Sequence, residues 1–356
     1  MFPKSMYIHI PFCKKICKYC DFCKVYYKKD WVINYLNELN NEISKKYKNN
    51  KLKTLYIGGG TPSSLSFNEL DILFKHIDKI SFYKNYEFTF ECNVEDINEE
   101  LLLYLKNKRV NRLSIGVESF NKKILNTLGR DYNKNNYKKI ILAKKYFDNI
   151  NIDLIYGVSG ENISLLKKDL KKFIKLDINH ISIYSLILEN NTILKKEKYI
   201  ELDDNIQSDM YDYICKILKK NNFIHYEISN FSKKGYESKH NLCYWNNHEY
   251  YGFGLGASGY IENIRYTNTR SINNYLLGNY VIEENLLSEK EMMENEMILN
   301  LRKLKGISKK DFLKKYNKNI EDVFDLSKLK YNNGFYYIDE EDIFLSNSIL
   351  CDFIDI

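Results

Sequence analysis

The chain has 356 residues, of which 44% are hydrophobic and 28% are charged, and its formal net charge is +7. This composition is typical of a globular protein with a large core, and no apolar run approaches the ~20 residues of a membrane-spanning helix. Lysines supply almost all of the positive charge and lie scattered beside acidic residues, so we expect no nucleic-acid partner. Weak attraction to an acidic membrane surface stays open. The chain begins directly with an apolar segment, which predicts no targeting peptide and a cytoplasmic location.

Strand-like and helix-like segments alternate through the first half of the chain. Short apolar runs predict strands, and apolar residues at helical spacing predict the helices between them. Six such units in a row predict a parallel sheet with covering helices, either an open doubly wound sheet or a partial barrel. We expect strands at residues 6–10, 52–57, 86–91, 112–117, 150–156 and 178–186, and helices at 32–43, after a capping box at 66–69, at 99–106 and at 133–147.

The pattern changes after residue 186. A helix at 207–220 precedes a glycine- and aromatic-rich stretch, and the pattern is helical again from about 288, with a hairpin expected at Asn333-Gly334. We therefore expect a main domain over 1–225, a glycine- and aromatic-rich segment over 226–285, and a small helical, winged-helix-like α+β domain over 286–356.

Three cysteines at x3 and x2 spacing follow the first predicted strand, namely Cys13, Cys17 and Cys20. In a cytosolic chain such a cluster indicates a metal or iron–sulfur site rather than a disulfide. Three thiolates on one loop can bind three irons of a four-iron cluster and leave the fourth iron open to another ligand. Cys23 follows closely and keeps two alternatives open, a zinc site with four cysteines and a set of inert buried thiols.

Candidate ligands occur where the predicted strands end. The second strand runs into Gly58-Gly59-Gly60 and Thr61, and acidic residues stand at the ends of the next strands or within them. Because the carboxyl ends of parallel strands meet at one rim, these residues are expected to converge. The glycines either let the backbone approach a ligand or serve only the geometry of a turn. The acidic candidates are Glu91, Glu118 and Asp153.

Three further features bear on ligand binding. Arg130 either clamps a carboxylate or pairs with Asp131 or another acid. The run Gly254–Gly259 matches a dinucleotide fingerprint by letter, but it opens no helix, so we reject a nicotinamide or flavin site there. His240, in the run His-Asn-Leu-Cys-Tyr-Trp, is either a packed residue or an axial ligand to haem iron.

Four of these motifs together resemble the oxygen-independent coproporphyrinogen III oxidase superfamily of radical S-adenosylmethionine (SAM) proteins. The motifs are the run Tyr7–Phe22, the Gly-Gly-Gly-Thr-Pro turn, Ser114–Phe120 and Asp153–Gly157. The segment around His240 is similar to that of the haem-chaperone branch. The resemblance spans nearly the whole chain and implies an α/β fold, a partial TIM-like (βα)6 barrel with a C-terminal α+β accessory domain.

The same resemblance implies the ligands of each group. It implies a [4Fe-4S] cluster on Cys13, Cys17 and Cys20, whose open iron binds SAM, and haem as a cargo on His240. Glu118 stands where the family has Gln, Ser159 where it has Pro, and Cys23 where haem chaperones have Asn. The implied SAM contacts are Tyr7, Gly59, Gly60, Thr61, Glu91, Glu118, Arg130 and Asp153.

The expected function is that of a haem chaperone that delivers haem to respiratory haem proteins. The alternatives are a coproporphyrinogen oxidase, which uses a SAM-derived radical on propionate side chains, and a zinc-stabilised binding module. A cysteine motif that begins at residue 13, without a long preceding extension, and the motif around His240 both favour the chaperone. Enzymatic turnover, homodimerisation and peripheral membrane contact stay open.

Overall fold

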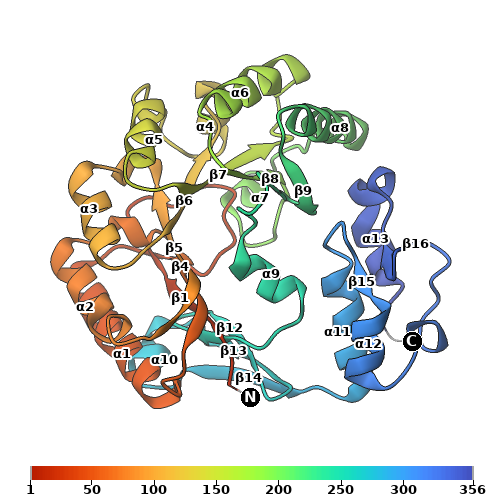
Figure 1. Ribbon diagram of the computed structural model, residues 1–356. Coiled ribbons are helices and arrows are strands. Elements are labelled where there is room, and N and C mark those ends of the chain that lie inside the picture. The colour runs from red at the N-terminus through yellow and green to blue at the C-terminus, as the bar shows by residue number, and fades with distance from the viewer. Residues whose placement is uncertain (1, 355–356) are drawn as a thin grey trace.

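A nine-stranded sheet forms the centre of the computed structural model, which describes residues 2–354 (Figure 1). The strand order is β11-β1-β4-β5-β6-β7-β8-β10-β9, and the six strands from β1 to β8 in this order are all parallel. The sheet curves, and its two edge strands do not pair with one another, so the architecture is a partial (βα)6 barrel. The parallel strands are β1 (Ser5–Ile10), β4 (Leu52–Gly59), β5 (Phe82–Asn93), β6 (Arg112–Glu118), β7 (Asn149–Tyr156) and β8 (His180–Ser185).

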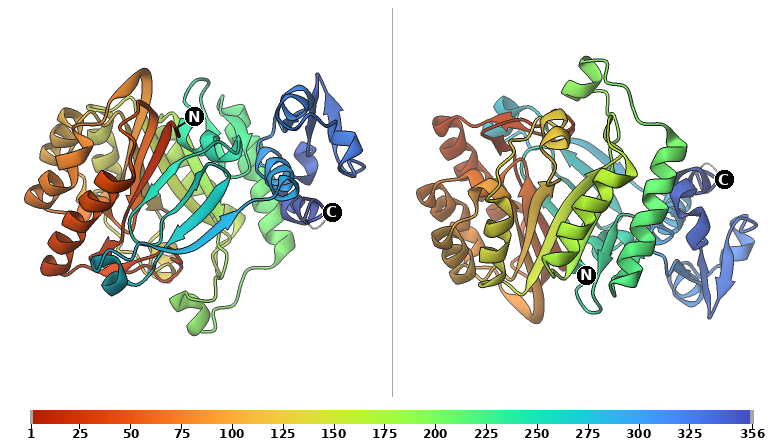
Figure 2. Two further views of the ribbon diagram at one scale, coloured as in Figure 1. Left: turned by 90° about the horizontal axis from the view of Figure 1, so that it is seen from below. Right: turned by 90° about the horizontal axis from the view of Figure 1, so that it is seen from above.

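Helices cover the outer face of this sheet (Figures 1 and 2). The first helix buries Val32, Leu36 and Ile43, which lie on one face, and the expected capping box of Ser66 and Glu69 begins the second. The six predicted strands and the helices between them are thus confirmed. The helices and 3-10 turns are α1 (Lys29–Lys46), η1 (Pro62–Ser64), α2 (Phe67–Ile77), η2 (Val94–Asp96), α3 (Glu99–Asn107), α4 (Lys122–Thr127), α5 (Asn136–Lys144), α6 (Ile163–Lys175), α7 (Ile193–Lys196) and α8 (Asp204–Lys220).

Residues 226–285 contribute strands to both edges of the main sheet. Strand β11 (Tyr251–Phe253) pairs parallel with β1, and β10 (Asn230–Ser232) pairs antiparallel with β8. The run Gly254–Gly259 joins β11 to the next strand and opens no helix, as expected. The other elements of this region are β9 (Ile224–Glu227), α9 (Lys239–Trp245), β12 (Ser258–Ile261), β13 (Ile264–Asn268), α10 (Ile272–Leu276) and β14 (Val281–Leu286).

The C-terminal part packs beside the open edge of the sheet, at β9 (Figure 1). The backbone N–H of Ile228 donates to the carbonyl of Arg302 at 3.1 Å, and that of Leu304 donates to Tyr226 at 3.2 Å. The hairpin expected at Asn333-Gly334 forms. This part contains α11 (Glu289–Asn300), β15 (Ile307–Ser308), α12 (Lys309–Tyr316), η3 (Ile320–Asp322), β16 (Lys330–Asn332), β17 (Phe335–Tyr337), η4 (Glu340–Leu345) and α13 (Ser346–Cys351).

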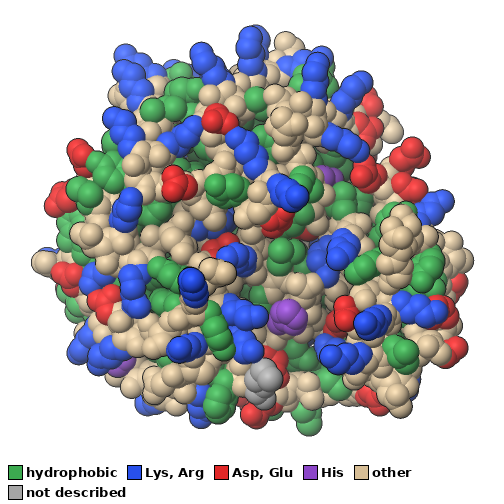
Figure 3. Space-filling model, in the orientation of Figure 1, with side chains coloured by type: hydrophobic (Ala, Val, Ile, Leu, Met, Phe, Trp, Pro, Cys, Tyr) green, Lys and Arg blue, Asp and Glu red, His purple; other side chains and the backbone are tan. Residues whose placement is uncertain are grey.

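The helices and the surface charge of residues 2–354 both bear on contact with a membrane. None of the described helices combines the length and the apolarity that crossing a membrane requires. On the face drawn in Figure 3, lysine and arginine side chains are spread among acidic and apolar ones rather than gathered in one patch.

Candidate functional site

The three motif cysteines lie on one loop at the carboxyl end of β1. The loop connects β2 (Phe12–Cys13) to β3 (Val25–Tyr26), and this short parallel pair closes its base. The tip is held by the end of α4, because the backbone N–H of Lys18 donates to the carbonyl of Leu128 at 3.0 Å. The thiol of Cys13 is buried, whereas Cys17 and Cys20 are partly exposed. The loop thus presents three thiols at the barrel mouth.

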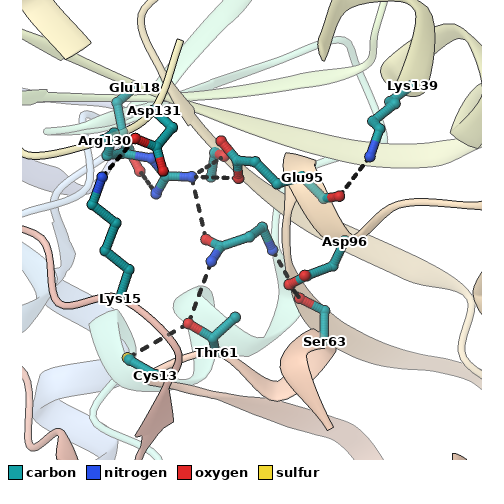
Figure 4. A network of polar contacts seen from close by, with 12 residues as sticks. Cys13, Lys15, Thr61, Ser63, Glu95, Asp96, Glu118, Arg130, Asp131 and Lys139 are labelled. Atoms are coloured by element: carbon teal, nitrogen blue, oxygen red, sulfur yellow. Dashed lines mark hydrogen bonds and ion pairs between the residues drawn. The ribbon is translucent and has the colours of Figure 1, made fainter. Parts of the chain in front are cut away.

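A chain of polar contacts connects this loop to the ends of β5 and β6 (Figure 4). The hydroxyl of Thr61 donates to Sγ of Cys13 at 3.5 Å, and Asn93 Nδ2 donates to the same Thr61 oxygen at 3.4 Å. Nη2 of Arg130 donates to Asn93 Oδ1 at 3.3 Å. Thr61, a strand-end candidate, and Arg130, which the family resemblance added, therefore belong to one network that reaches Cys13.

Neighbouring protein atoms leave no room for a side chain at Gly59 and Gly60. A Cβ on Gly60 would lie 2.7 Å from the backbone of Pro11 and 2.9 Å from Sγ of Cys13. Gly59 has a φ of +119°, and a Cβ there would lie 2.7 Å from the ring of His9. The turn is therefore packed directly against β1 and the cysteine loop, which is reason enough for glycine at both positions. A contact with SAM at these glycines stays a prediction.

Arg130 forms a buried ion pair with Glu118. Its Nη1 lies 3.2 Å from Glu118 Oε1, and both side chains are more than nine-tenths buried. Its Nη2 lies 3.2 Å from Glu95 Oε2 and donates to the carbonyl of Gly116 at 3.0 Å. Asp131 instead pairs with Lys15 at the surface. Burial raises the pKa of Glu118 to about 7, although the charge of Arg130 opposes the shift.

The predicted strand-end acids line one cavity of about 600 Å³ inside the barrel mouth, together with Tyr7. Cys20 and Cys23 form part of its wall. A smaller neighbouring cavity of about 140 Å³ is lined by Cys17, Thr61 and Arg130. The cysteine loop therefore borders both spaces. Glu91, Glu118 and Asp153 face the large cavity, whereas Gly59, Gly60 and His240 line neither.

Two of these acids are held by hydrogen bonds. Glu91 accepts from the hydroxyl of Tyr56 at 2.7 Å and from the backbone N–H of Gly59 at 2.9 Å, while its burial raises its pKa to about 7. Asp153 accepts from Nδ2 of Asn151 at 2.8 Å, and burial raises its pKa as well. Raised pKa values in a cavity are typical of groups that meet a charged ligand.

His240 lies behind this cavity, inside the protein, and is 1% exposed. Its Nδ1 is 2.8 Å from the hydroxyl of Thr54, and its Nε2 is 2.8 Å from the hydroxyl of Tyr244. Burial lowers its pKa to about 3, so the ring is neutral at physiological pH. Both ring nitrogens are occupied in this arrangement. A haem iron could bind this ring only after one of the two hydroxyls has moved.

The donor set of the loop suits a cluster that is held by three thiolates. Each cysteine of a four-iron cluster binds a different iron, so its thiols need not converge on one point. Residues 2–354 hold no group of three His, Cys, Asp or Glu side chains close enough for a single metal ion. Cys23, unlike Cys17 and Cys20, is buried. A Cβ added to Gly256 would lie 2.9 Å from its Sγ, so this thiol packs against the loop after β11.

The sequence analysis missed several polar residues that line the same cavity. They occupy alternate positions of the parallel strands, whereas the positions between them, such as Leu113 and Ile115, are buried in the hydrophobic core. The signal was present in the run Arg-Leu-Ser-Ile-Gly-Val-Glu, which alternates polar and apolar residues. The missed residues are Arg112, Ser114, Asn151 and Ser182.

Comparison with known proteins agrees with this geometry. Residues 7–173 match the model of the radical SAM superfamily. The chain is 43% identical over 273 residues to "Heme chaperone HemW" of Lactococcus lactis subsp. lactis (strain IL1403), covering 75% of this chain and 72% of that protein. It is 37% identical over 337 residues to "Heme chaperone HemW" of Bacillus subtilis (strain 168), covering 90% and 89%.

A solved structure confirms the fold over almost the whole length. The chain superimposes on the coproporphyrinogen III oxidase HemN of Escherichia coli, a radical SAM enzyme, with a TM-score of 0.86 and 19% identity, covering 99% of this chain and 90% of that one. The parallel partial barrel, the cysteine loop at its mouth and the match of residues 7–173 together make this chain a radical SAM protein. Within that superfamily, this chain belongs to the HemW family. Membership of the radical SAM superfamily implies a [4Fe-4S] cluster and SAM.

The buried acid Glu118 is expected to make stability depend on pH. Its pKa is about 7 in the folded chain against an ordinary 4.5, so between these values the folded state holds a proton that the unfolded chain has released. The free energy of unfolding should therefore fall as pH rises through this window. Relative to Glu118→Gln, the wild type should lose about 1–3 kcal/mol between about pH 5 and pH 8.

Urea unfolding of the anaerobic, cluster-free protein at several pH values measures this difference. Glu95→Gln, which removes the other carboxylate that contacts Arg130, is the matched control for loss of a partner of the guanidinium. Parallel pH profiles of the wild type and Glu118→Gln would show that Glu118 carries no such proton.

Proposed function

We propose that this chain is a haem chaperone that binds a [4Fe-4S] cluster, SAM and haem, and that it delivers haem to respiratory haem proteins. The observation that carries the proposal is the cavity of about 600 Å³ between the cysteine loop and the barrel strands. Its size suits a cofactor-sized ligand. The relatives named for haem chaperone activity, matched over most of their length, supply the choice of cargo.

The resident cofactors would be held at the barrel mouth. Cys13, Cys17 and Cys20 would bind the cluster, which would supply electrons and one iron with an open position. SAM carries an ammonium and a sulfonium, and the acids that line the large cavity suit these positive charges. The SAM contacts proposed here are Tyr7, Gly59, Gly60, Thr61, Glu91, Glu118, Arg130 and Asp153.

His240 is the proposed axial ligand of haem, after release of Tyr244. Ligating imidazoles commonly donate their other ring N–H to a fixed partner, and the hydroxyl of Thr54, on β4, can accept such a bond from Nδ1. That arrangement would leave Nε2 as the ligand once the Tyr244 hydroxyl moves away. The lowered pKa of His240 supports this role, because neutral imidazole is the form that binds a metal.

Replacing His240 by alanine is expected to weaken haem binding or to shift the Soret band. Tyr244→Phe, which frees Nε2, should bind haem at least as well as the wild type. His248→Ala is the matched control, since His248 lies in the same segment but faces a separate cavity of about 120 Å³. Haem titrations of the four proteins, with thermal unfolding as a check of folding, make the comparison.

An activity assay separates the chaperone from an oxidase. The reconstituted protein with SAM and a reductant should fail to convert coproporphyrinogen III to protoporphyrinogen IX. Robust conversion, together with haem binding no tighter than that of an unrelated protein, would contradict the proposed function. A Soret band unchanged in His240→Ala would remove only the proposed ligand.

The proposed setting is the cytoplasm, where thiols stay reduced and available to iron. Haem-accepting respiratory proteins are the proposed partners. A homodimer and peripheral contact with a membrane are compatible with this setting.

A further inference from the structure

Arg112 is a buried cation that makes no direct ion pair with any described residue, although its charge opposes the rise that burial causes in the pKa of Glu91 and of Asp153. It is the first residue of β6, its side chain is 2% exposed, and it lines the cavity of about 600 Å³. Its Nη1 makes one long hydrogen bond, 3.5 Å to the hydroxyl of Thr89, and its Nε has no hydrogen-bond partner. Within residues 2–354, no carboxylate forms an ion pair with Arg112. A guanidinium is rarely buried in this state, because the lost hydration is not repaid.

The acids of the same cavity lie nearer its mouth than Arg112 does. In the sheet register Arg112 lies opposite Thr89 and Asn149, at the start of β6, whereas Glu91 lies opposite Ser114. Asp153 is a further two residues toward the carboxyl ends, opposite Gly116. The cavity therefore has acidic groups toward its mouth and a single unpaired guanidinium at its floor.

We propose that Arg112 is the receptor for a carboxylate of the molecule that fills this cavity. A guanidinium is a planar fork of donors that matches a carboxylate in two parallel hydrogen bonds. The inference rests on the proposed function, under which a propionate of haem supplies this carboxylate. The carboxylate of SAM is the second source of the same chemistry.

The other arginines beside the cavity have partners already. Arg130 is paired with Glu118 and Glu95 at the rim. Arg270 lines the mouth of the large cavity and donates to the carbonyl of Asp21 at 2.9 Å. Arg112 is thus the arginine of this site whose hydrogen-bonding capacity a ligand would complete.

The test compares ligands that differ only in the carboxylate. Wild-type protein is titrated with haem and with haem dimethyl ester, and separately with SAM and with decarboxylated SAM. If a propionate reaches Arg112, the ester should bind about 10- to 100-fold more weakly than haem. Arg112→Gln should bind haem about equally weakly, and it should no longer distinguish haem from the ester.

Arg270→Gln is the matched control, because it removes a second arginine from the same cavity and should keep the wild-type discrimination. Loss of discrimination in Arg112→Gln for the SAM pair instead of the haem pair would support the receptor and assign its ligand as SAM. The inference would be overturned if Arg112→Gln distinguished both ligand pairs as well as the wild type does. It would also be overturned if Arg270→Gln lost the ability to distinguish them.

The titrations of the wild type test carboxylate recognition even if Arg112→Gln fails to fold. Equal affinity for both members of each pair would show that no carboxylate is recognised. Failure of the proposed function has a different signature, because the wild type would then bind neither haem nor its ester in a saturable way. In that case the SAM pair alone would support or overturn the role of Arg112.

Discussion

Replacing Cys13 by alanine is expected to abolish the visible absorbance of the reconstituted protein and nearly all of its bound iron. Cys13 is the most buried of the three motif thiols, and its sulfur is tied to Thr61 at 3.5 Å. With only two of the three motif cysteines left, a four-iron cluster would lose one of its proposed protein ligands. Anaerobic reconstitution, iron analysis and the spectral response to SAM measure the effect.

Cys23→Ala is the discriminating variant of this experiment. Cys23 is buried and packs against Gly256, so its removal should leave the iron content and the SAM response intact. Cys92→Ala, which removes a buried thiol of β5, controls for the loss of a cysteine as such. Equal loss of metal in the Cys13 and Cys23 variants, with zinc rather than iron bound, would favour the four-cysteine zinc site.

Arg130→Ala is expected to lower the free energy of unfolding by about 3–5 kcal/mol at alkaline pH, where the carboxyl of Glu118 ionises without its partner, and by less near pH 7, where that carboxyl keeps its proton. Both side chains of the pair are more than nine-tenths buried, so solvent screens the interaction little. The variant should also bind SAM more weakly if Arg130 belongs to the SAM site. Urea unfolding and SAM titration of the anaerobic protein measure the two effects.

The double variant Arg130→Ala/Glu118→Gln separates the causes. Removing the acid as well should restore part of the lost stability, since the uncompensated carboxyl is then absent. It should not restore SAM binding if the guanidinium itself contacts SAM. A double variant that is as unstable as the sum of the two single variants would mean that the pair is not coupled.

The convergence of the strand-end acids could be predicted because it follows from topology alone. Parallel strands joined by helices bring their carboxyl ends to one rim, so Glu91, Glu118 and Asp153 had to meet once the six units were recognised. The partner of Arg130 could not be chosen in the same way. Asp131, its neighbour in sequence, pairs with Lys15, and Glu118 and Glu95 take its place through contacts between strand ends.

The sequence by itself determined the elements whose signals are local. The alternation of strands and helices, the capping box at Ser66, the spacing of the three cysteines and the turn at Asn333 each depend on residues a few positions apart. Propensity, capping and hydrophobic periodicity act over this range, so these features follow from the chain alone.

Only the tertiary structure decided which residues face which neighbours across long separations. His240 meets Thr54 across 186 positions, which buries the ring and occupies Nδ1. Strand β11 joins β1 at the sheet edge, although nearly the whole barrel lies between them in sequence. The isolation of Arg112 likewise depends on where the acids of other strands stop. Such contacts are fixed by the packing of the whole sheet, which no local pattern of residues encodes.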